Sequence, residues 1–481
     1  MPLFLRRKHG CAVTGAARGL RFGMSASVFG ATMWLLQLFP LVASLSCRVF
    51  YRLHVGGVRV PSAGPVLLVA NHPNSLLDPF LVTVAAQRPV RFLAKAPLFS
   101  DPLIGWGIRA VGAIPVYRRM DDPSQTGRNE ETFRAVHAAL ARSAAVGIFP
   151  EGISHDYPAL APLKTGAARI ALGAATATAG AFPIIPVGLV FEAKEIFRSA
   201  AYIVVGEPVH WNDLASEGVD SPTAVRELTR RIDESLHAVT VNLERREDSR
   251  LIAAATAIYA AEVEEPEVPH AEAGRRIAAA RALARLTQDG DPDATLAAQA
   301  VRRHATTLTM LGLSPADVHL STPFARALKW TVRRLAPVQM LTAAIAAVGT
   351  AIFWAPYALT RIVAERDAAT DVLATRKLLY GGAIFKIWIL LLAIVLGLAF
   401  GWLAALLALF LLPLLALRTL SYGERWADSA RDARSFFVRR SRAKTLSELR
   451  HRQQEIGRLL SELYHRAEAA RAASGRAGDP A

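Results

Sequence analysis

The residues of this chain best suited to chemistry lie in the segment NHPNSLLDP, residues 71–79. A histidine beside a carboxylate is the arrangement of a general base, because the carboxylate holds the proton of one ring nitrogen while the other nitrogen accepts a hydroxyl proton. His72 directly follows the apolar run 66–70, and a rigid sheet positions residues at its strand ends. We predict His72 as the base and Asp78 as its partner; a purely structural histidine is the competing interpretation.

The six-residue separation of His72 and Asp78 constrains the backbone between them. On one straight helix, at about 3.6 residues per turn, their side chains would point about 120° apart and would not meet. Pro73 and Pro79 bracket the segment, and a proline restricts the residue before it to extended conformations. The sequence therefore predicts a loop or tight turn here.

Basic side chains follow two later runs of the chain. Arg118 and Arg119 come just after the run 113–116, where guanidinium groups can form bidentate hydrogen bonds to a phosphate. Lys95, in FLAKAPLF, is a second candidate for binding an anionic ligand. These residues predict a phosphate site, and a solvated basic pair at a strand end is the alternative.

The segment IFPEGISHDYPALAPLKTGAARIAL, residues 148–172, adds a carboxylate and a further cation. Gly152 permits a tight turn after the apolar run, and Glu151 can accept hydrogen bonds from ligand hydroxyls or hold Arg118. Lys164, with the start of the helix that follows it, is suited to binding phosphate. We expect these residues to complete an anion-binding site.

Two neighbouring features predict no catalytic group. Ser154, His155 and Asp156 are consecutive, whereas the members of a hydrolase triad must converge side by side, so we expect no triad. The segment FPIIPVGLVF carries Pro186 in a buried strand and no titratable side chain. We expect it to form the wall of an apolar pocket; ordinary core packing is the alternative.

Residues 48–240 have the texture of the domain that must position these side chains. Short β-branched runs alternate with helical stretches, which is the pattern of an α/β domain. The runs are almost continuously apolar, so we expect most strands to be buried on both faces. The predicted strands are 66–70, 90–93, 113–116, 146–149, 184–190 and 202–205.

Uncharged runs outside this domain indicate a membrane. In the N-terminal segment 1–47, residues 27–47 are just long enough to cross a bilayer, which takes roughly 20 residues. Pro40 interrupts them, and a helix lying in the membrane surface is the alternative. Basic residues flank both ends, so charge asymmetry fixes no orientation.

Residues 331–420 contain two more such runs and are predicted to be embedded in the membrane. The helix of 338–360, at about 1.5 Å per residue, would cross a hydrocarbon core of roughly 30 Å. The run 388–417 would reach about 45 Å as one helix, which is too long without strong tilt. Halves broken near Gly401 are each too short to span, so we predict a shallow hairpin.

The remaining segments are predicted to be helical. Residues 241–330, broken by the acidic stretch 262–269, read as a helical insert or lid, with a packed spacer as the alternative. In the C-terminal segment 421–481, a capping box at Thr445 and Glu448 opens an amphipathic helix, and the tail SGRAGDPA is expected to be disordered. Its two-heptad seam suits a homodimer, although packing within the chain is commoner for so short a seam. The seam comprises Leu446, Leu449, Gln453, Ile456, Leu460 and Leu463.

Composition separates two classes of anionic partner. The formal net charge of +16 suits nucleic acid or an anionic membrane. The positive mean hydropathy of +0.27, the uncharged runs and the lack of a nucleic-acid-binding motif favour membrane lipids over nucleic acid. Cys11 and Cys47 are too few for a disulfide framework or a zinc site, which fits a reducing, cytosol-facing location without a metal. The charges at 6–8 lie far from the first apolar run, so we expect no cleaved signal peptide.

Four blocks in this order, a His and Asp motif, GxIPVxR, FPEG and IPVG, resemble the phospholipid/glycerol acyltransferase family. The resemblance covers roughly residues 66–190 and implies an α/β fold with a central mixed sheet flanked by helices. It also implies a role for each matching residue. By this resemblance His72 is the base, Asp78 orients it, Arg118 and Glu151 with Gly152 bind the glycerol phosphate, and Pro186 shapes the site.

One departure from the family concerns the His and Asp motif. Most members separate the two residues by four positions, whereas this chain has five, Pro73 to Leu77. The longer spacing, together with FPEGISHD and LKTGAA, is similar to the subgroup of fungal glycerol-3-phosphate/dihydroxyacetone-phosphate acyltransferases and bacterial relatives, which also carry C-terminal membrane segments. That similarity favours the first acylation step of glycerolipid synthesis over the second.

The resemblance implies a membrane-bound O-acyltransferase of phospholipid synthesis. It would move a fatty acyl group from acyl-CoA or acyl-carrier protein to a hydroxyl of glycerol 3-phosphate, without a covalent enzyme intermediate, metal or other cofactor. A 1-acylglycerol-3-phosphate acyltransferase is the enzymatic alternative. A catalytically silent lipid-binding scaffold is an alternative of another class, against which the intact His72, Asp78, Arg118 and Glu151 argue; a transporter would need more spanning segments.

Overall fold

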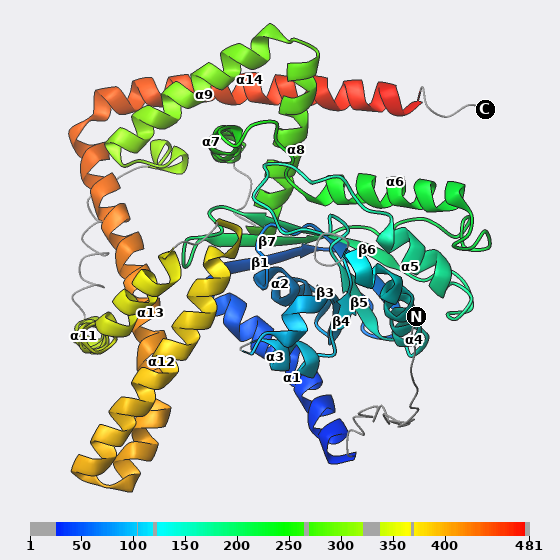
Figure 1. Cartoon of the computed structure of the whole chain (residues 1–481). Helices are drawn as coiled ribbons and strands as arrows, with labels where there is room; N and C mark the ends of the chain where they lie inside the picture. The colour runs from blue at the N-terminus through cyan, green and yellow to red at the C-terminus, as the bar shows by residue number, and fades with distance from the viewer. Residues whose placement is uncertain are drawn as a thin grey trace, which may run out of the picture.

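The computed structural model describes residues 26–102, 104–118, 123–263, 269–320, 337–366 and 370–476 (Figure 1). Its described strands form one seven-stranded sheet in the order β1-β7-β6-β2-β5-β3-β4. Only β6 and β7 pair antiparallel, so the predicted central mixed sheet is confirmed. The strands are β1 (Arg52–Gly57), β2 (Val66–Ala70), β3 (Val90–Lys95), β4 (Ile114–Val116), β5 (Ala145–Ile148), β6 (Ile184–Phe191) and β7 (Ala200–Val205).

The sheet lies between two layers of helices, with a hydrophobic core on each face. Helices α1 (Ala26–Phe50) and α2 (Leu77–Ala86) cover one face, and α4 (Asn129–Ala141), α5 (Gly166–Ala174) and α6 (Pro222–Val239) cover the other. The central strand β2 is buried along its whole length: Leu68 joins the first core and Leu67 the second. As predicted, its continuous apolar run reflects burial on both faces. Short helices η1 (Ala96–Ser100), α3 (Gly105–Ala110) and η2 (Pro123–Arg128) connect β3 to α4.

Helix α1 belongs to both the protein core and the apolar surface. Phe39 packs edge-on against Phe80 of α2 with 5.2 Å between ring centroids, and Cys47 is fully buried. On the opposite side Leu41 and Leu45 are about two-thirds exposed, at 67% and 60%. Helix α1 is therefore buried on one side and exposed on the other, which suits the alternative of a helix lying in the membrane surface.

The predicted insert forms, with the C-terminal helix, a four-helix unit that we call the helical module. It consists of α7 (Asp248–Glu262), α8 (Pro269–Gln288), α9 (Pro292–Leu311) and α14 (Ala443–Arg476), joined by the short η3 (Pro315–Val318). Clusters of apolar side chains join α14 to α7, α8 and α9. The module also packs on the sheet, since Tyr202 of β7 donates a hydrogen bond of 2.6 Å to Glu272 of α8.

The C-terminal seam is used inside the chain. Leu449, Ile456 and Leu463 are buried against the other helices of the module, and Gln453, also buried, donates to Glu262 of α7 at 2.7 Å. The helix begins at Ala443, so the predicted start at the Thr445 capping box was wrong: α14 follows α13 after a single break at Arg442. Residues 477–481 of the predicted disordered tail lie outside the described residues, while 474–476 are helical.

Three described helices are long and apolar enough to cross a membrane: α11 (Pro337–Glu365), α12 (Thr370–Phe400) and α13 (Trp402–Ser441). Helices α12 and α13 meet at Gly401, whose φ of +90° suits a glycine. The predicted break is therefore correct, but the predicted shortness of each half was wrong, because the helices extend well beyond the uncharged run. The α12–α13 hairpin and α1 project from one side of the sheet, and the helical module lies on the opposite side (Figure 1).

Candidate active site

The loop between β2 and α2 brings His72 and Asp78 together. Ser75 adopts a positive φ of +50°, so the chain turns back before α2 begins. Asp78, in the first turn of α2, then accepts a hydrogen bond from His72 Nδ1 at 2.8 Å and another from the Asn74 amide at 2.7 Å, both on Oδ2. The predicted loop is confirmed, and five intervening residues leave the pair in contact.

The environment of this pair fixes the geometry of the imidazole. Asp78 is completely buried, and this burial raises the pKa of its carboxyl group, against which the hydrogen bond from His72 acts. The His72 ring, about one-fifth exposed, stacks on Phe149 with 4.0 Å between centroids and 10° between planes. Because Nδ1 is committed to Asp78, Nε2 is the nitrogen available to a substrate.

Glu151 holds the loops around His72 rather than facing solvent. Its buried carboxylate accepts hydrogen bonds from the His72 amide (2.8 Å, Oε1) and the Ala161 amide (2.8 Å, Oε2), and His155 Nε2 donates to Oε2. The His155 Nδ1 atom accepts from the Tyr157 amide, so its proton is on Nε2. With no exposed side-chain surface, Glu151 is placed to position the His72 loop.

Cationic groups converge on Gly152, at the end of β5. Arg118 Nη1 donates to the Gly152 carbonyl at 2.9 Å, and a Cβ atom built on Gly152 would lie 2.8 Å from Lys164 Nζ. Gly152 has a φ of +71°, the left-handed region that glycine adopts without steric cost. Lys95 is exposed at the end of β3, where it is in register with Val116 of β4. We call Arg118 and Lys164 the Gly152 cations; Arg119 lies outside the described residues.

A cavity of about 510 Å³ lies on the other side of His72, which we call the His72 cavity. Its lining includes Asn71, His72 and His155, together with residues 189–196, which comprise the end of β6 and the segment that follows it. Residues 156–160, residues 240–243 and parts of α7 and α8 also line it. His72, after β2, therefore lies between the Gly152 cations on the side of β5 and an open cavity on the side of β6.

The comparison with protein families identifies this arrangement. Residues 52–190, which contain the His72–Asp78 pair and the Gly152 cations, match the family model described as Acyltransferase. We call this segment the acyltransferase domain, after the family model that it matches. The helical module and the α12–α13 hairpin lie outside the matched residues.

Known proteins resemble the chain over part of its length. Glycerol-3-phosphate O-acyltransferase 2 of Saccharomyces cerevisiae is 40% identical over 134 residues, which are 27% of this chain and 18% of that protein. The chloroplastic 1-acyl-sn-glycerol-3-phosphate acyltransferase BAT2 of Brassica napus is 32% identical over 156 residues, 32% of this chain and 42% of that protein. The crystal structure of a Thermotoga maritima 1-acyl-sn-glycerophosphate acyltransferase aligns at a TM-score of 0.33 and 20% identity, covering 45% of this chain and 82% of that one. The chain thus spans less than half the length of the two curated relatives.

The acyltransferase domain contains supporting residues that the sequence analysis missed. Asn71 is hydrogen bonded to both the amide and the carbonyl of Leu189, at 2.7 and 3.0 Å, which ties the His72 loop to β6. The buried Asn74 donates to the Tyr51 hydroxyl at 2.7 Å. Lys194 Nζ donates to the Pro73 carbonyl at 2.7 Å. Asn71 and Lys194 each follow a predicted strand, and that position was the signal that could have revealed them.

The consecutive residues Ser154, His155 and Asp156 contact other parts of the chain. Ser154 and Asp156 form no triad with His155: Ser154 Oγ accepts from the Ser75 amide, and Asp156 pairs with Lys194 at 2.6 Å. Burial alone would raise the pKa of Asp156, but hydrogen bonds from Lys194 and Arg246 outweigh it and lower the pKa.

Pro186 is buried in β6, in register with Val69, and does not line the His72 cavity. A Cβ atom built on Gly206 would lie 2.9 Å from its ring, so its surroundings match the core-packing alternative.

Proposed function

We propose that this protein is a membrane-associated O-acyltransferase that transfers a fatty acyl group from a thioester donor to a hydroxyl of glycerol 3-phosphate. The observation that carries the proposal is the His72 Nδ1–Asp78 Oδ2 contact of 2.8 Å, between the Gly152 cations and the His72 cavity. A general base, an anion site and a cavity for the second substrate are what the transfer requires. Arg118 and Lys164 are the groups we assign to the phosphate.

The proposed reaction is a direct transfer in one base-assisted substitution. His72 Nε2 removes the proton of the acceptor hydroxyl while the hydroxyl oxygen attacks the thioester carbonyl carbon. The tetrahedral oxyanion collapses, the new ester C–O bond remains, and the C–S bond breaks. The imidazolium returns its proton to the leaving thiolate, so His72 ends unchanged. Asp78 stabilises the transient positive charge on His72, and the route needs no cofactor besides the acyl-CoA or acyl-carrier-protein donor.

We assign glycerol 3-phosphate, rather than its 1-acyl derivative, as the acceptor. Two yeast glycerol-3-phosphate O-acyltransferases match this chain at 40% and 36% identity, and the plant 1-acyl-glycerol-3-phosphate enzyme matches at 32%. The five-residue spacing of His72 and Asp78 supports the same assignment. An acceptor with one acyl chain already attached is the second candidate, and it differs only in needing a membrane-side apolar site.

The apolar helices support membrane lipids as partners. Along α12 and α13 many side chains are exposed and apolar, among them Leu398 at 86% and Phe410 at 77%, a surface that hydrocarbon would cover. We propose that the acyltransferase domain lies at the cytosolic face of the membrane, where both substrates are soluble and thiols stay reduced.

An acyl-transfer assay on membranes tests this function. Wild type and His72→Ala receive radiolabelled acyl-CoA with glycerol 3-phosphate or 1-acyl-glycerol 3-phosphate in separate reactions. We expect transfer to glycerol 3-phosphate by the wild type and a loss of about 100- to 10,000-fold in the variant, the usual contribution of a general base. The control is His210→Ala, which removes an exposed histidine outside the site and should keep full activity.

The outcomes separate the candidate functions. Preference for 1-acyl-glycerol 3-phosphate would move the protein to the second acylation step. No His72-dependent transfer to either acceptor, from acyl-CoA or acyl-carrier protein, would leave the catalytically silent lipid-binding scaffold. Thermal unfolding of the His72→Ala protein must match the wild type for either conclusion to hold.

A further inference from the structure

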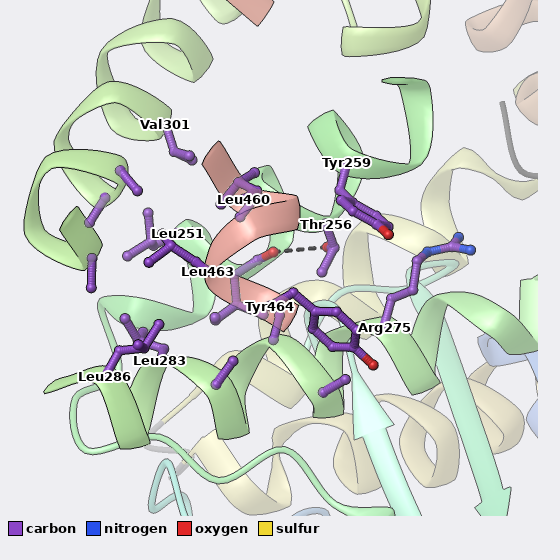
Figure 2. A pocket seen from close by; sticks show the side chains of 18 of the residues that line it. Leu251, Thr256, Tyr259, Arg275, Leu283, Leu286, Val301, Leu460, Leu463 and Tyr464 are labelled. Atoms are coloured by element: carbon purple, nitrogen blue, oxygen red, sulfur yellow. Dashed lines mark hydrogen bonds between the residues drawn. The ribbon is translucent and has the colours of Figure 1, made fainter. Parts of the chain in front are cut away.

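A second cavity lies outside the acyltransferase domain, within the helical module (Figure 2). We call it the module cavity. Its volume is about 370 Å³, within the range of roughly 300–1,000 Å³ of small-molecule sites, and α7, α8, α9 and α14 all contribute to its wall. Aliphatic side chains dominate its lining, including Leu251, Leu283, Leu286, Val301, Leu460 and Leu463. A cavity of this chemistry is a poor site for water and suits a hydrocarbon ligand.

The polar side chains of the module cavity lie together on one side of it. In Figure 2, Tyr259, Arg275 and Tyr464 are grouped apart from Leu283 and Leu286. The fourth polar residue, Thr256, donates its hydroxyl hydrogen to the backbone of its own helix, at Ile252 O and 2.8 Å. The leucine side therefore offers only dispersion and hydrophobic contact, which is the chemistry of an alkyl chain.

The module cavity and the His72 cavity share one lining residue, Ile252. Leu189, held by Asn71 beside His72, lines the His72 cavity together with Val241 and Leu243. Ile252 of α7 lines both cavities and is only 4% exposed, since it packs with Leu243 and Ala280 of α8. Ile252 thus forms part of the wall of each cavity and lies between them.

We propose that the module cavity receives the far end of the donor's acyl chain, which passes Ile252 from the thioester at His72. This inference rests on the proposed function and names the part of the molecule that selects donor chain length. The donor is the favoured source of the chain because it arrives from water. A chain anchored in the membrane would approach from the side of α1 and the α12–α13 hairpin, opposite the module (Figure 1).

Binding to the His72→Ala protein in nanodiscs tests the proposal without turnover. The probes are saturated acyl-CoA esters of short and long chain, measured by titration calorimetry. Ala282→Leu, in the same background, fills the cavity from α8. We expect it to weaken the long-chain ester by at least about tenfold and leave the short-chain ester unchanged, because each buried methylene is worth roughly fourfold in affinity. Ala284→Leu adds the same volume on α8 but lines neither cavity, and should change neither affinity.

A gate variant and a rim variant identify the route of entry. Ile252→Ala should favour longer chains, because it removes the side chain between the cavities. Arg275→Gln should leave acyl-CoA binding unchanged; a large loss there would mean that a separate anionic amphiphile, held at the polar side, occupies the cavity. An unchanged chain-length preference in Ala282→Leu would overturn the proposal. His72-dependent transfer by the wild type would still stand in that case, so failure of the cavity and failure of the proposed function are distinguishable.

Discussion

At the scale of single residues, Asp78 combines a proposed catalytic contact with a cost in stability. Its buried Oδ2 accepts hydrogen bonds from His72 Nδ1 and the Asn74 amide, while burial raises the pKa of the carboxyl group. Asp78→Asn keeps an oxygen at this place but removes the negative charge that stabilises a protonated His72. We expect acyl transfer to fall by about 100- to 10,000-fold, measured with glycerol 3-phosphate and acyl-CoA.

The same substitution should stabilise the fold at neutral pH. The pKa of Asp78 is near 3.8 in the unfolded chain and higher in the folded protein. The free energy of unfolding of the wild type therefore falls as the pH rises from the lower pKa through the higher one. The amide side chain of the variant does not titrate, so the melting temperature of Asp78→Asn relative to wild type should increase from about pH 4 to neutral, by on the order of 2–4 °C if the gain is about 1 kcal/mol. A difference that shrinks as pH rises would contradict this account.

Substitution of Gly152 tests whether the Gly152 cations bind the acceptor phosphate. An alanine at its φ of +71° costs about 1–2 kcal/mol, and its Cβ would displace Lys164 Nζ, 2.8 Å away. We expect Gly152→Ala to raise the KM for glycerol 3-phosphate by about tenfold, the effect of about 1.4 kcal/mol, with a smaller change in kcat. Gly64→Ala is the matched control, since Gly64 has a φ of +81° and no atom within 4 Å of its Cβ position. Equal KM changes in both variants would show that backbone strain alone is responsible.

At the scale of elements, Arg198 joins the acyltransferase domain to α13. Its guanidinium pairs with both carboxylate oxygens of Glu424, one contact being 2.9 Å, and also donates to the carbonyls of Val49 and Tyr51 at the end of α1. At 22% and 29% side-chain exposure the pair is shielded from solvent more than a surface ion pair. The contact therefore holds the α12–α13 hairpin against the acyltransferase domain.

Glu424→Gln should loosen this junction. Losing a charged, two-contact hydrogen bond costs about 1–2 kcal/mol, so we expect a lower melting temperature and faster limited proteolysis of the folded protein. Asp428→Asn, one turn further along α13, removes a carboxylate that is 56% exposed and should have little effect. If both variants behave alike, the Arg198 contact does not join the two parts.

The elements also show what the sequence could and could not predict. Strands β2, β5 and β6 were predicted because their continuous apolar runs follow from burial on two faces. The edge strand β1, RLHVGG, was missed, since it is half exposed and carries two glycines. The contact of His72 with Asp78 depends on the backbone turn at Ser75, which no spacing rule specifies. The burial of Glu151 depends on the distant segment at Ala161, so its positioning of His72 could not be read from FPEG alone.

At the scale of the whole molecule, the proposed membrane contact and the proposed acyl-chain cavity lie on opposite sides of the sheet. The α12–α13 hairpin and α1 project to one side, and the helical module covers the other (Figure 1). Thr375 Oγ1, near the start of α12, lies 3.5 Å from the Asn74 carbonyl oxygen, so the hairpin reaches the loop that carries His72. The product, a lipid, would therefore form beside the membrane while the thioester donor approaches from water.

This arrangement requires the hairpin to be embedded in the bilayer. Leu391, 51% exposed near the middle of the apolar part of α12, would then face hydrocarbon, where an arginine costs about 2.5–3.5 kcal/mol. We expect Leu391→Arg to lower the fraction of protein that resists extraction from membranes by alkaline carbonate. Phe437→Arg places the same charge at a 68% exposed position in the polar half of α13 and should extract like the wild type. If Leu391→Arg resists extraction as well as the wild type, the hairpin lies outside the hydrocarbon, and α11 and α1, the latter with its exposed Leu41 and Leu45, become the remaining contacts with the bilayer.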